Sequence, residues 1–120
     1  MNVENAQAQM RKGVLEYCIL AIINEGEIYP TDVINRLKES NLLVAEGTVY
    51  PLLNRLKTME LLSYKWVESN SGPPRKYYQL TDNGRLFLTE LNKTWQELAH
   101  AVSINTKSLN TTQQWTSYYM

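Results

Sequence analysis

The chain has 120 residues, a length that suits one domain with a single core. Its apolar content of 43% and charged content of 20% are typical of a folded protein, and its single cysteine excludes an internal disulfide. Twelve basic and twelve acidic side chains cancel, so only local charge can indicate or exclude a polyanionic partner. Cys18 lies in an apolar stretch, which predicts a buried, unreactive thiol and fits a reducing cytoplasm.

The first predicted helix runs from about Ala8 to Asn24. Its start imitates a signal peptide, because Arg11 and Lys12 precede the apolar run VLEYCILAII, residues 14–23. That run is interrupted by a glutamate, lacks a cleavage pattern and is too short to span a membrane, so no membrane association is expected. A helix that is apolar nearly all round needs cover on several sides, most simply from a second subunit.

A second helix is predicted to begin at Pro30, which suits a first turn, and to end near Ser40. A third should run to about Glu60, because apolar residues recur at helical spacing: Val49, Leu52, Leu53, Leu56 and Met59.

Pro51 lies near the start of this third helix. If Thr48 caps the helix, the proline falls in the first turn, where its missing N–H leaves no bond unmade. If the helix begins at Glu46, the proline ring is strained against the carbonyl of Gly47. The sequence leaves both alternatives open.

Alternating apolar residues from Leu62 to Trp66 predict a half-buried strand. Residues 69–74, SNSGPP, are rich in turn formers, and residues 75–80, RKYYQL, predict a second strand. Together they predict a hairpin whose tip is stiffened by Pro73-Pro74.

A fourth helix of about 24 residues, capped by the segment 81–83, should be roughly 36 Å long. Its apolar residues step by three and four, which makes a heptad seam too long for a small domain to cover. The seam predicts a partner helix, most simply the same helix of a second copy; the alternative is packing on the first helix of the same chain. The predicted dimer-interface residues are Leu88, Leu91, Trp95, Leu98 and Val102.

Three helices, a hairpin and a long helix follow one another in winged helix-turn-helix order. The predicted fold is therefore mainly α with a small β-hairpin (α+β): a winged helix-turn-helix plus a long C-terminal dimerisation helix. We expect a DNA-binding domain over residues 1–80, the dimerisation helix over residues 81–106, and a disordered tail over residues 107–120, which are mostly polar.

The outward face of the third helix contains no acid. It carries two cations, an amide and hydroxyl groups, which are the residue types that contact phosphates and bases. From Gly47 to Leu80 there are five basic and two acidic residues, and Arg75 and Lys76 flank the predicted hairpin tip. Because a few phosphate contacts per subunit give only weak DNA binding, two subunits are needed for useful affinity. The exposed set on the helix is Gly47, Thr48, Tyr50, Pro51, Asn54, Arg55, Lys57 and Thr58.

EGTVYPLLNRLK, residues 46–57, and SGPPRKYYQLTDNG, residues 71–84, resemble the two signature stretches of the PadR-like transcriptional regulators. The resemblance extends from residue 10 to about residue 104 and is greatest to the small subfamily with a single C-terminal helix. It implies a homodimeric repressor that binds a palindromic double-stranded DNA operator through the third helix and the wing. The matching positions are Gly47, Thr48, Tyr50, Pro51 and Arg55 in the DNA-reading motif, and Gly72, Pro74, Arg75 and Lys76 in the wing.

The resemblance also implies an effector site. In multidrug-sensing members, a tryptophan on the last helix lines a pore at the dimer centre, and Trp95 matches that position. Two indoles across a two-fold axis would sandwich a planar aromatic effector, with Glu16, Tyr17 and Leu20 as the wall. The alternative is that Trp95 simply fills the dimer core.

A rival interpretation is a winged-helix module that binds protein and not DNA, which the zero net charge favours. An enzyme is not expected, because the only histidine, His100, has no Ser or Cys beside it and the sequence lacks a metal-spaced cluster or a phosphate-binding glycine loop. No cofactor and no metal are expected.

Overall fold

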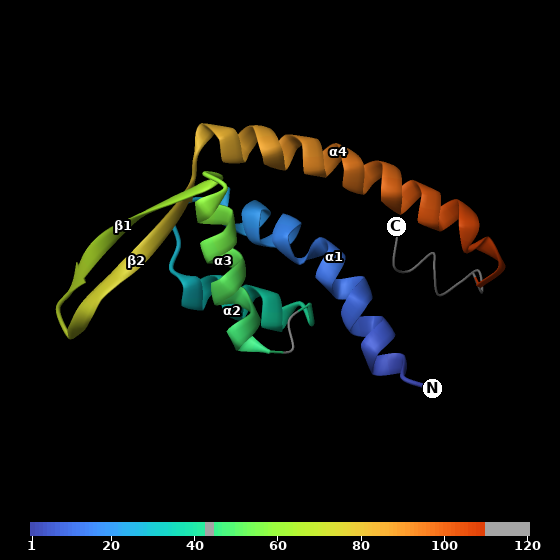
Figure 1. The fold of residues 1–120 in the computed structure, drawn as a ribbon, viewed down its shortest axis with the longest axis horizontal. Helices are drawn as coiled ribbons and strands as arrows, with labels where there is room; N and C mark the ends of the chain where they lie inside the picture. Colours follow the sequence, from blue (N-terminus) through green and yellow to red (C-terminus); the bar gives the residue numbers. More distant parts are fainter. Residues whose placement is uncertain (43–44, 110–120) are drawn as a thin grey trace. The chain divides into compact units, whose positions relative to one another are not determined.

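The computed structural model describes residues 1–42 and 45–109 of the chain. The elements confirm the predicted mainly helical architecture with one antiparallel hairpin (Figure 1). The chain divides into two compact units, Met1–Thr89 and a second unit from Glu90 onward. In chain order the elements are α1 (Val3–Ile23), α2 (Pro30–Glu39), a 3-10 helix (Glu46–Thr48), α3 (Val49–Thr58), β1 (Leu62–Ser69), β2 (Gly72–Leu80), α4 (Asp82–Asn105) and a second 3-10 helix (Lys107–Leu109).

The first unit has one apolar core, formed where α1, α2 and α3 meet the base of the hairpin. Full burial of such a side chain stabilises the fold by about 1.5–3 kcal/mol. Burial of one face of α3 in this core leaves its opposite face to solvent. The most deeply buried side chains are Ile19, Leu20 and Ile23 of α1, Val33 and Leu37 of α2, and Val49, Leu53 and Leu56 of α3.

Helix α1 begins at Val3, five residues before the predicted start at Ala8. The reason is a cap, because the Asn2 side chain accepts a hydrogen bond from the Asn5 N–H at 3.0 Å. Near the end of this helix, Cys18 is only half-buried, but burial still raises the pKa of its thiol. The thiol is therefore protonated at neutral pH.

The start of α3 shows which of the two predicted positions Pro51 occupies in the helix. A 3-10 turn over Glu46–Thr48 precedes the α-helix, which begins at Val49. Pro51 thus lies in the first turn of α3, the first of the two alternatives. The Thr48 side chain makes no capping hydrogen bond, so the 3-10 turn leads into the helix without one.

The other end of α3 closes with paired backbone bonds from Glu60 to Lys57, at 2.9 Å, and from Leu61 to Leu56, at 3.0 Å. Glu60 adopts a left-handed conformation with φ of 62°, as the Schellman motif requires. This sharp end turns the chain directly into β1, so the hairpin starts beside the last turn of α3.

The hairpin differs from its prediction at the tip. Ser69 pairs with Gly72, so only Asn70 and Ser71 form the turn, and Pro73-Pro74 lie inside β2. A two-stranded sheet has only edges, so prolines without N–H groups are tolerated there. A register irregularity between Val67 and Ser69 accompanies them. Figure 1 shows the hairpin extending away from α2 and α3.

Helix α4 is 24 residues long, as predicted, and starts with a close backbone approach. The Gly84 N–H donates to the Thr81 hydroxyl at 2.9 Å, and this hydroxyl donates to the Glu60 carbonyl at 2.7 Å. A Cβ at Gly84 would lie 2.1 Å from the carbonyl oxygen of Leu61. Glycine is therefore required in the first turn of α4.

The predicted disordered tail is only partly described. Lys107–Leu109 forms a 3-10 helix, although the sequence predicts disorder from residue 107. The remainder of the predicted tail lies outside the described residues. Within the described ranges, no helix is long and apolar enough to cross a membrane.

Candidate nucleic-acid interface

All the residues of the third helix that the sequence predicts to bind DNA are solvent-exposed in the structure. These residues are exposed because the opposite face of the helix, formed by Val49, Leu53 and Leu56, is buried. The only acid bordering the start of this surface, Glu46, forms an ion pair with Lys38 at 2.6 Å. The exposed residues are Gly47, Thr48, Tyr50, Pro51, Asn54, Arg55 and Lys57.

Two lysines meet on one tyrosine ring between α3 and the hairpin. The Nζ of Lys57, from α3, lies 4.9 Å from the centroid of the Tyr64 ring, and the Nζ of Lys76, from β2, lies 4.4 Å from it. Lys76 also lies over Trp66, its direct cross-strand partner, at 5.4 Å. Trp66 is 61% exposed, so this end of the strand is not half-buried as predicted. We call Lys57, Tyr64, Trp66 and Lys76 the lysine–aromatic cluster.

Arg75 is exposed but is folded back onto α2. Its guanidinium lies 3.9 Å from the centroid of the Tyr29 ring and donates a hydrogen bond of 2.8 Å to the Thr31 hydroxyl. Tyr29 also packs edge-on against Tyr77, with ring centroids 4.5 Å apart. Arg75 therefore connects β2 with the start of α2. The other predicted wing residues, Gly72 and Pro74, are exposed near the turn.

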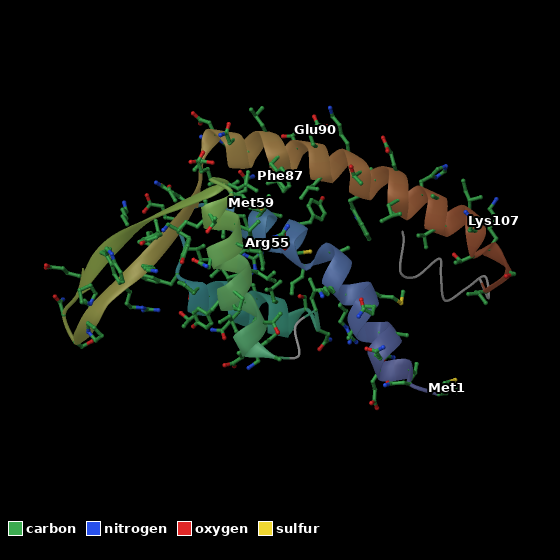
Figure 2. All side chains as sticks on the ribbon, in the orientation of Figure 1. Met1, Arg55, Met59, Phe87, Glu90 and Lys107 are labelled. Atoms are coloured by element: carbon green, nitrogen blue, oxygen red, sulfur yellow. The ribbon has the colours of Figure 1, made fainter. Side chains whose placement is uncertain are left out.

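Arg55 has an acidic neighbour that the spacing of α3 alone does not indicate. Its guanidinium forms an ion pair with Glu16 of α1, and Figure 2 shows Arg55 on the side of α3 toward α1. The Arg55 side chain remains 59% exposed, whereas that of Glu16 is 26% exposed. The guanidinium thus borders solvent while its charge is partly compensated.

The remaining cation of the hairpin, Lys65, pairs with Glu27 at 3.0 Å. Within residues 1–42 and 45–109, Lys57 and Lys76 form no ion pair with a carboxylate. Their cation–π contacts leave the full positive charge for an external anion. These two lysines, like Arg75, therefore keep their charge available to an anion at this surface.

The residues predicted to bind an effector have different environments. Leu20 is completely buried in the core, which removes it from a ligand wall. Tyr17 is half-buried, and Glu16 binds Arg55. Trp95, in the second unit, is 39% exposed.

The predicted dimer seam is incompletely covered in the single chain. Leu88 and Leu91 are half-buried, whereas Leu98 and Val102 are 51% and 52% exposed. An apolar stripe of this kind on a long helix is typical of a surface that packs on another helix.

Sequence reasoning missed three contributors to this surface: Tyr64, Trp66 and Glu16. The first two were assigned only to a half-buried strand. Pairing Leu62 with Leu80 places Lys76 opposite Trp66, so a correct hairpin register would have found that contact. The Arg55–Glu16 pair joins positions 39 residues apart, and no local pattern carries it.

No group of three or more His, Cys, Asp or Glu side chains in the described part of the chain could hold a metal ion. The arrangement offers cations, aromatic rings and an exposed helix face, which suit recognition of a polyanion.

Comparison with known proteins agrees with the fold. Residues 19–90 match the family model of the transcriptional regulator PadR-like family. A PadR-like transcription factor from Bacteroides fragilis is 56% identical, with 82% of this chain and 96% of that chain covered and a TM-score of 0.69. A PadR-like transcriptional regulator from Bacillus cereus is 40% identical over 79% of this chain and 93% of that chain, with a TM-score of 0.70.

A third similar structure is Bacillus subtilis PadR in complex with operator DNA. It is 27% identical, with 65% of this chain and 46% of that chain covered and a TM-score of 0.60. The family match covers well over half of the chain, and the similar structures share its helices and hairpin. The chain belongs to the PadR-like family of transcriptional regulators, which are not enzymes.

Proposed function

We propose that this PadR-like regulator is a homodimeric, sequence-specific DNA-binding repressor. In this proposal α3 enters the major groove of a palindromic operator, and the hairpin follows the adjacent phosphate backbone. The observation that carries the proposal is the exposed face of α3, free of acids from Gly47 to Thr58 and continued by the lysine–aromatic cluster.

The side chains of this surface suit distinct roles. Thr48 lies just before α3, and Tyr50 and Asn54 lie in its first turns, where base edges are met. The Asn54 amide is capable of a bidentate contact with adenine. Lys57 and Lys76 neutralise phosphates, and Arg75 supports the hairpin from its contact with Thr31. Gly47 and Pro51 let the backbone approach the DNA closely, as do Gly72 and Pro74 on the wing. The structure of Bacillus subtilis PadR in complex with operator DNA supports the proposal that this chain binds an operator.

Dimerisation through α4 supplies the second half-site. The seam from Leu88 to Val102 is only partly covered within one chain, which favours pairing with a second copy. We accordingly assign residues 1–80 to DNA binding and residues 81–106 to dimerisation. Two subunits double the number of phosphate contacts, which a surface with few free cations requires.

An effector site at the dimer centre extends the proposal. Trp95 lies in the seam and stays partly exposed, so its indole can face a planar aromatic molecule. Glu16 would attract a cationic ligand, and Tyr17 would contact its rings. Because Glu16 also binds Arg55, a ligand at this carboxylate would alter the charge of the DNA-binding face.

Proflavine, a planar aromatic cation, tests this second site by quenching tryptophan fluorescence in the absence of DNA. Saturable quenching should disappear in Trp95→Ala and persist in Trp66→Phe, which controls for the other described tryptophan. Quenching that survives Trp95→Ala would contradict an effector site there.

The DNA-binding proposal is tested by selecting duplexes from a random pool and measuring binding of the full chain by fluorescence anisotropy. The expected result is a palindromic consensus, with affinity that falls steeply as salt rises. Asn54→Ala should relax the preference at one base pair, by about 1–3 kcal/mol. The alternative, a module that binds only protein, predicts no enriched sequence and little dependence on salt.

A further inference from the structure

The lysine–aromatic cluster contains a residue that no DNA-binding motif of the sequence includes. We propose that Tyr64 is a positioning residue for DNA binding. It holds the ammonium groups of Lys57 and Lys76 together, so that α3 and the hairpin present one cationic surface to the phosphate backbone. This inference rests on the proposed function and adds a specific role within it.

The contacts come from three separate elements. Tyr64 belongs to β1, Lys57 to the last turn of α3 and Lys76 to β2, and both Nζ atoms lie within 5 Å of the ring centroid. Without Tyr64, the two ammonium groups would lie at the ends of long flexible side chains, with no shared contact to fix the distance between them. The ring therefore determines the spacing between the charge of the helix and the charge of the wing.

The tyrosine ring is itself held in place by its neighbours. Its centroid lies 5.6 Å from that of Tyr78, its cross-strand partner, which is buried in the core. Trp66 also packs edge-on against it, with ring centroids 6.0 Å apart. Tyr64 is thus a half-buried platform with a fixed orientation, and not a mobile surface side chain.

Such a platform strengthens DNA binding in two ways. Lysine side chains lose rotamer freedom when they bind phosphate, and lysines already ordered on a ring lose less. A cation–π contact also keeps the ammonium fully charged, unlike an ion pair with a carboxylate, which would compete with the phosphate. Lys65, on the same strand, has such a competitor in Glu27.

The test measures binding of a short fluorescein-labelled duplex of mixed sequence, because phosphate contacts do not depend on sequence. Tyr64→Leu should weaken binding by up to about five- to thirtyfold, the scale of two exposed cation–π contacts. Tyr64→Phe, which keeps the ring face, should bind like the wild type. The slope of log affinity against log salt should stay unchanged in Tyr64→Leu, because both lysines still reach phosphates.

A double-mutant cycle separates positioning from a general structural role. The Tyr64→Leu effect should shrink when Lys57 or Lys76 is already methionine, and should be fully additive with Lys65→Met. Equal affinity of Tyr64→Leu and wild type would overturn the inference, as would additivity with all three lysines. If wild type binds neither this duplex nor any duplex selected from the random pool, the proposed function fails together with the inference.

A measurement on the free protein covers the case in which Tyr64→Leu does not fold. NMR should show the Cε protons of Lys57 and Lys76 shifted upfield by the tyrosine ring in both wild type and Tyr64→Phe. The Cε protons of Lys65 serve as the internal reference. Unshifted Lys57 and Lys76 signals would overturn the inference without any DNA present.

Discussion

Replacing Glu16 by Gln should strengthen DNA binding, because the substitution removes the carboxylate that compensates Arg55. The Arg55 side chain is 59% exposed and that of Glu16 is 26% exposed, so water partly screens the pair. Pairs of this kind are worth about 0.2–1 kcal/mol, and phosphate must offset that amount to engage the guanidinium. Affinity for a duplex should therefore rise about 1.4- to fivefold for each subunit that binds it.

The assay is anisotropy with the selected operator duplex at low and at moderate salt. The matched control is Glu25→Gln on the turn after α1, which removes the same charge from an ion pair with Arg36, at 2.8 Å. Glu25 pairs with Arg36 of α2 and not with a cation of α3, so its variant reports the effect of net charge. In an Arg55→Ala background, the gain from Glu16→Gln should disappear.

An unchanged or weaker affinity of Glu16→Gln would contradict competition between Glu16 and DNA for Arg55. That result would mean that Glu16 orients Arg55 toward DNA and does not compete for it. A gain equal to that of Glu25→Gln would also contradict it, since the effect would then come only from net charge.

Three further predictions concern stability and assembly. Gly84→Ala should destabilise the fold by about 1–3 kcal/mol in thermal unfolding, because its Cβ would meet the Leu61 carbonyl. Gly13→Ala, which has open space around it, should not destabilise the fold. A Gly84→Ala variant that melts at the temperature of the wild type would contradict the close approach. Wild type should sediment as the proposed dimer in analytical ultracentrifugation, and Leu98→Glu as a monomer, because the substitution places a charge in the apolar seam. A Leu98→Glu variant that remains dimeric would contradict pairing through this seam. Burial, and then the neighbouring Tyr64, raises the pKa of Tyr78. The folded state therefore holds that proton more tightly than the unfolded state, and stability should fall as the pH rises above the ordinary tyrosine value. Tyr78→Phe should remove part of that alkaline loss, measured by denaturant unfolding at several pH values, and an identical pH profile would contradict it.

The sequence predicts the architecture well because its elements carry strong local signals. The heptad spacing predicted the length of α4, and the apolar periodicity predicted the buried face of α3. Local signals failed at boundaries. Because Asn2 caps α1, the helix starts five residues before the predicted start. Because the turn has only two residues, Pro73-Pro74 lie inside β2 and not in the turn.

The candidate interface was only partly predictable for a different reason. The exposure of α3 follows from which of its residues are apolar, so the helix portion could be predicted. Contacts between elements distant in the chain have no periodic signal. The pairs Arg55–Glu16 and Arg75–Thr31, and the meeting of two lysines on Tyr64, depend on how the hairpin and helices pack.

The most direct test of the account is the salt dependence of operator binding by the double variant Lys57→Met, Lys76→Met. Each phosphate contact contributes about 0.9 to the slope of log affinity against log salt, so a dimer that loses four contacts should lose roughly 3.6. Lys65→Met, whose cation is paired with Glu27, serves as the control and should change the slope little. A double variant that binds the operator with the slope of the wild type would contradict the claim that α3 and the wing form the DNA-binding surface.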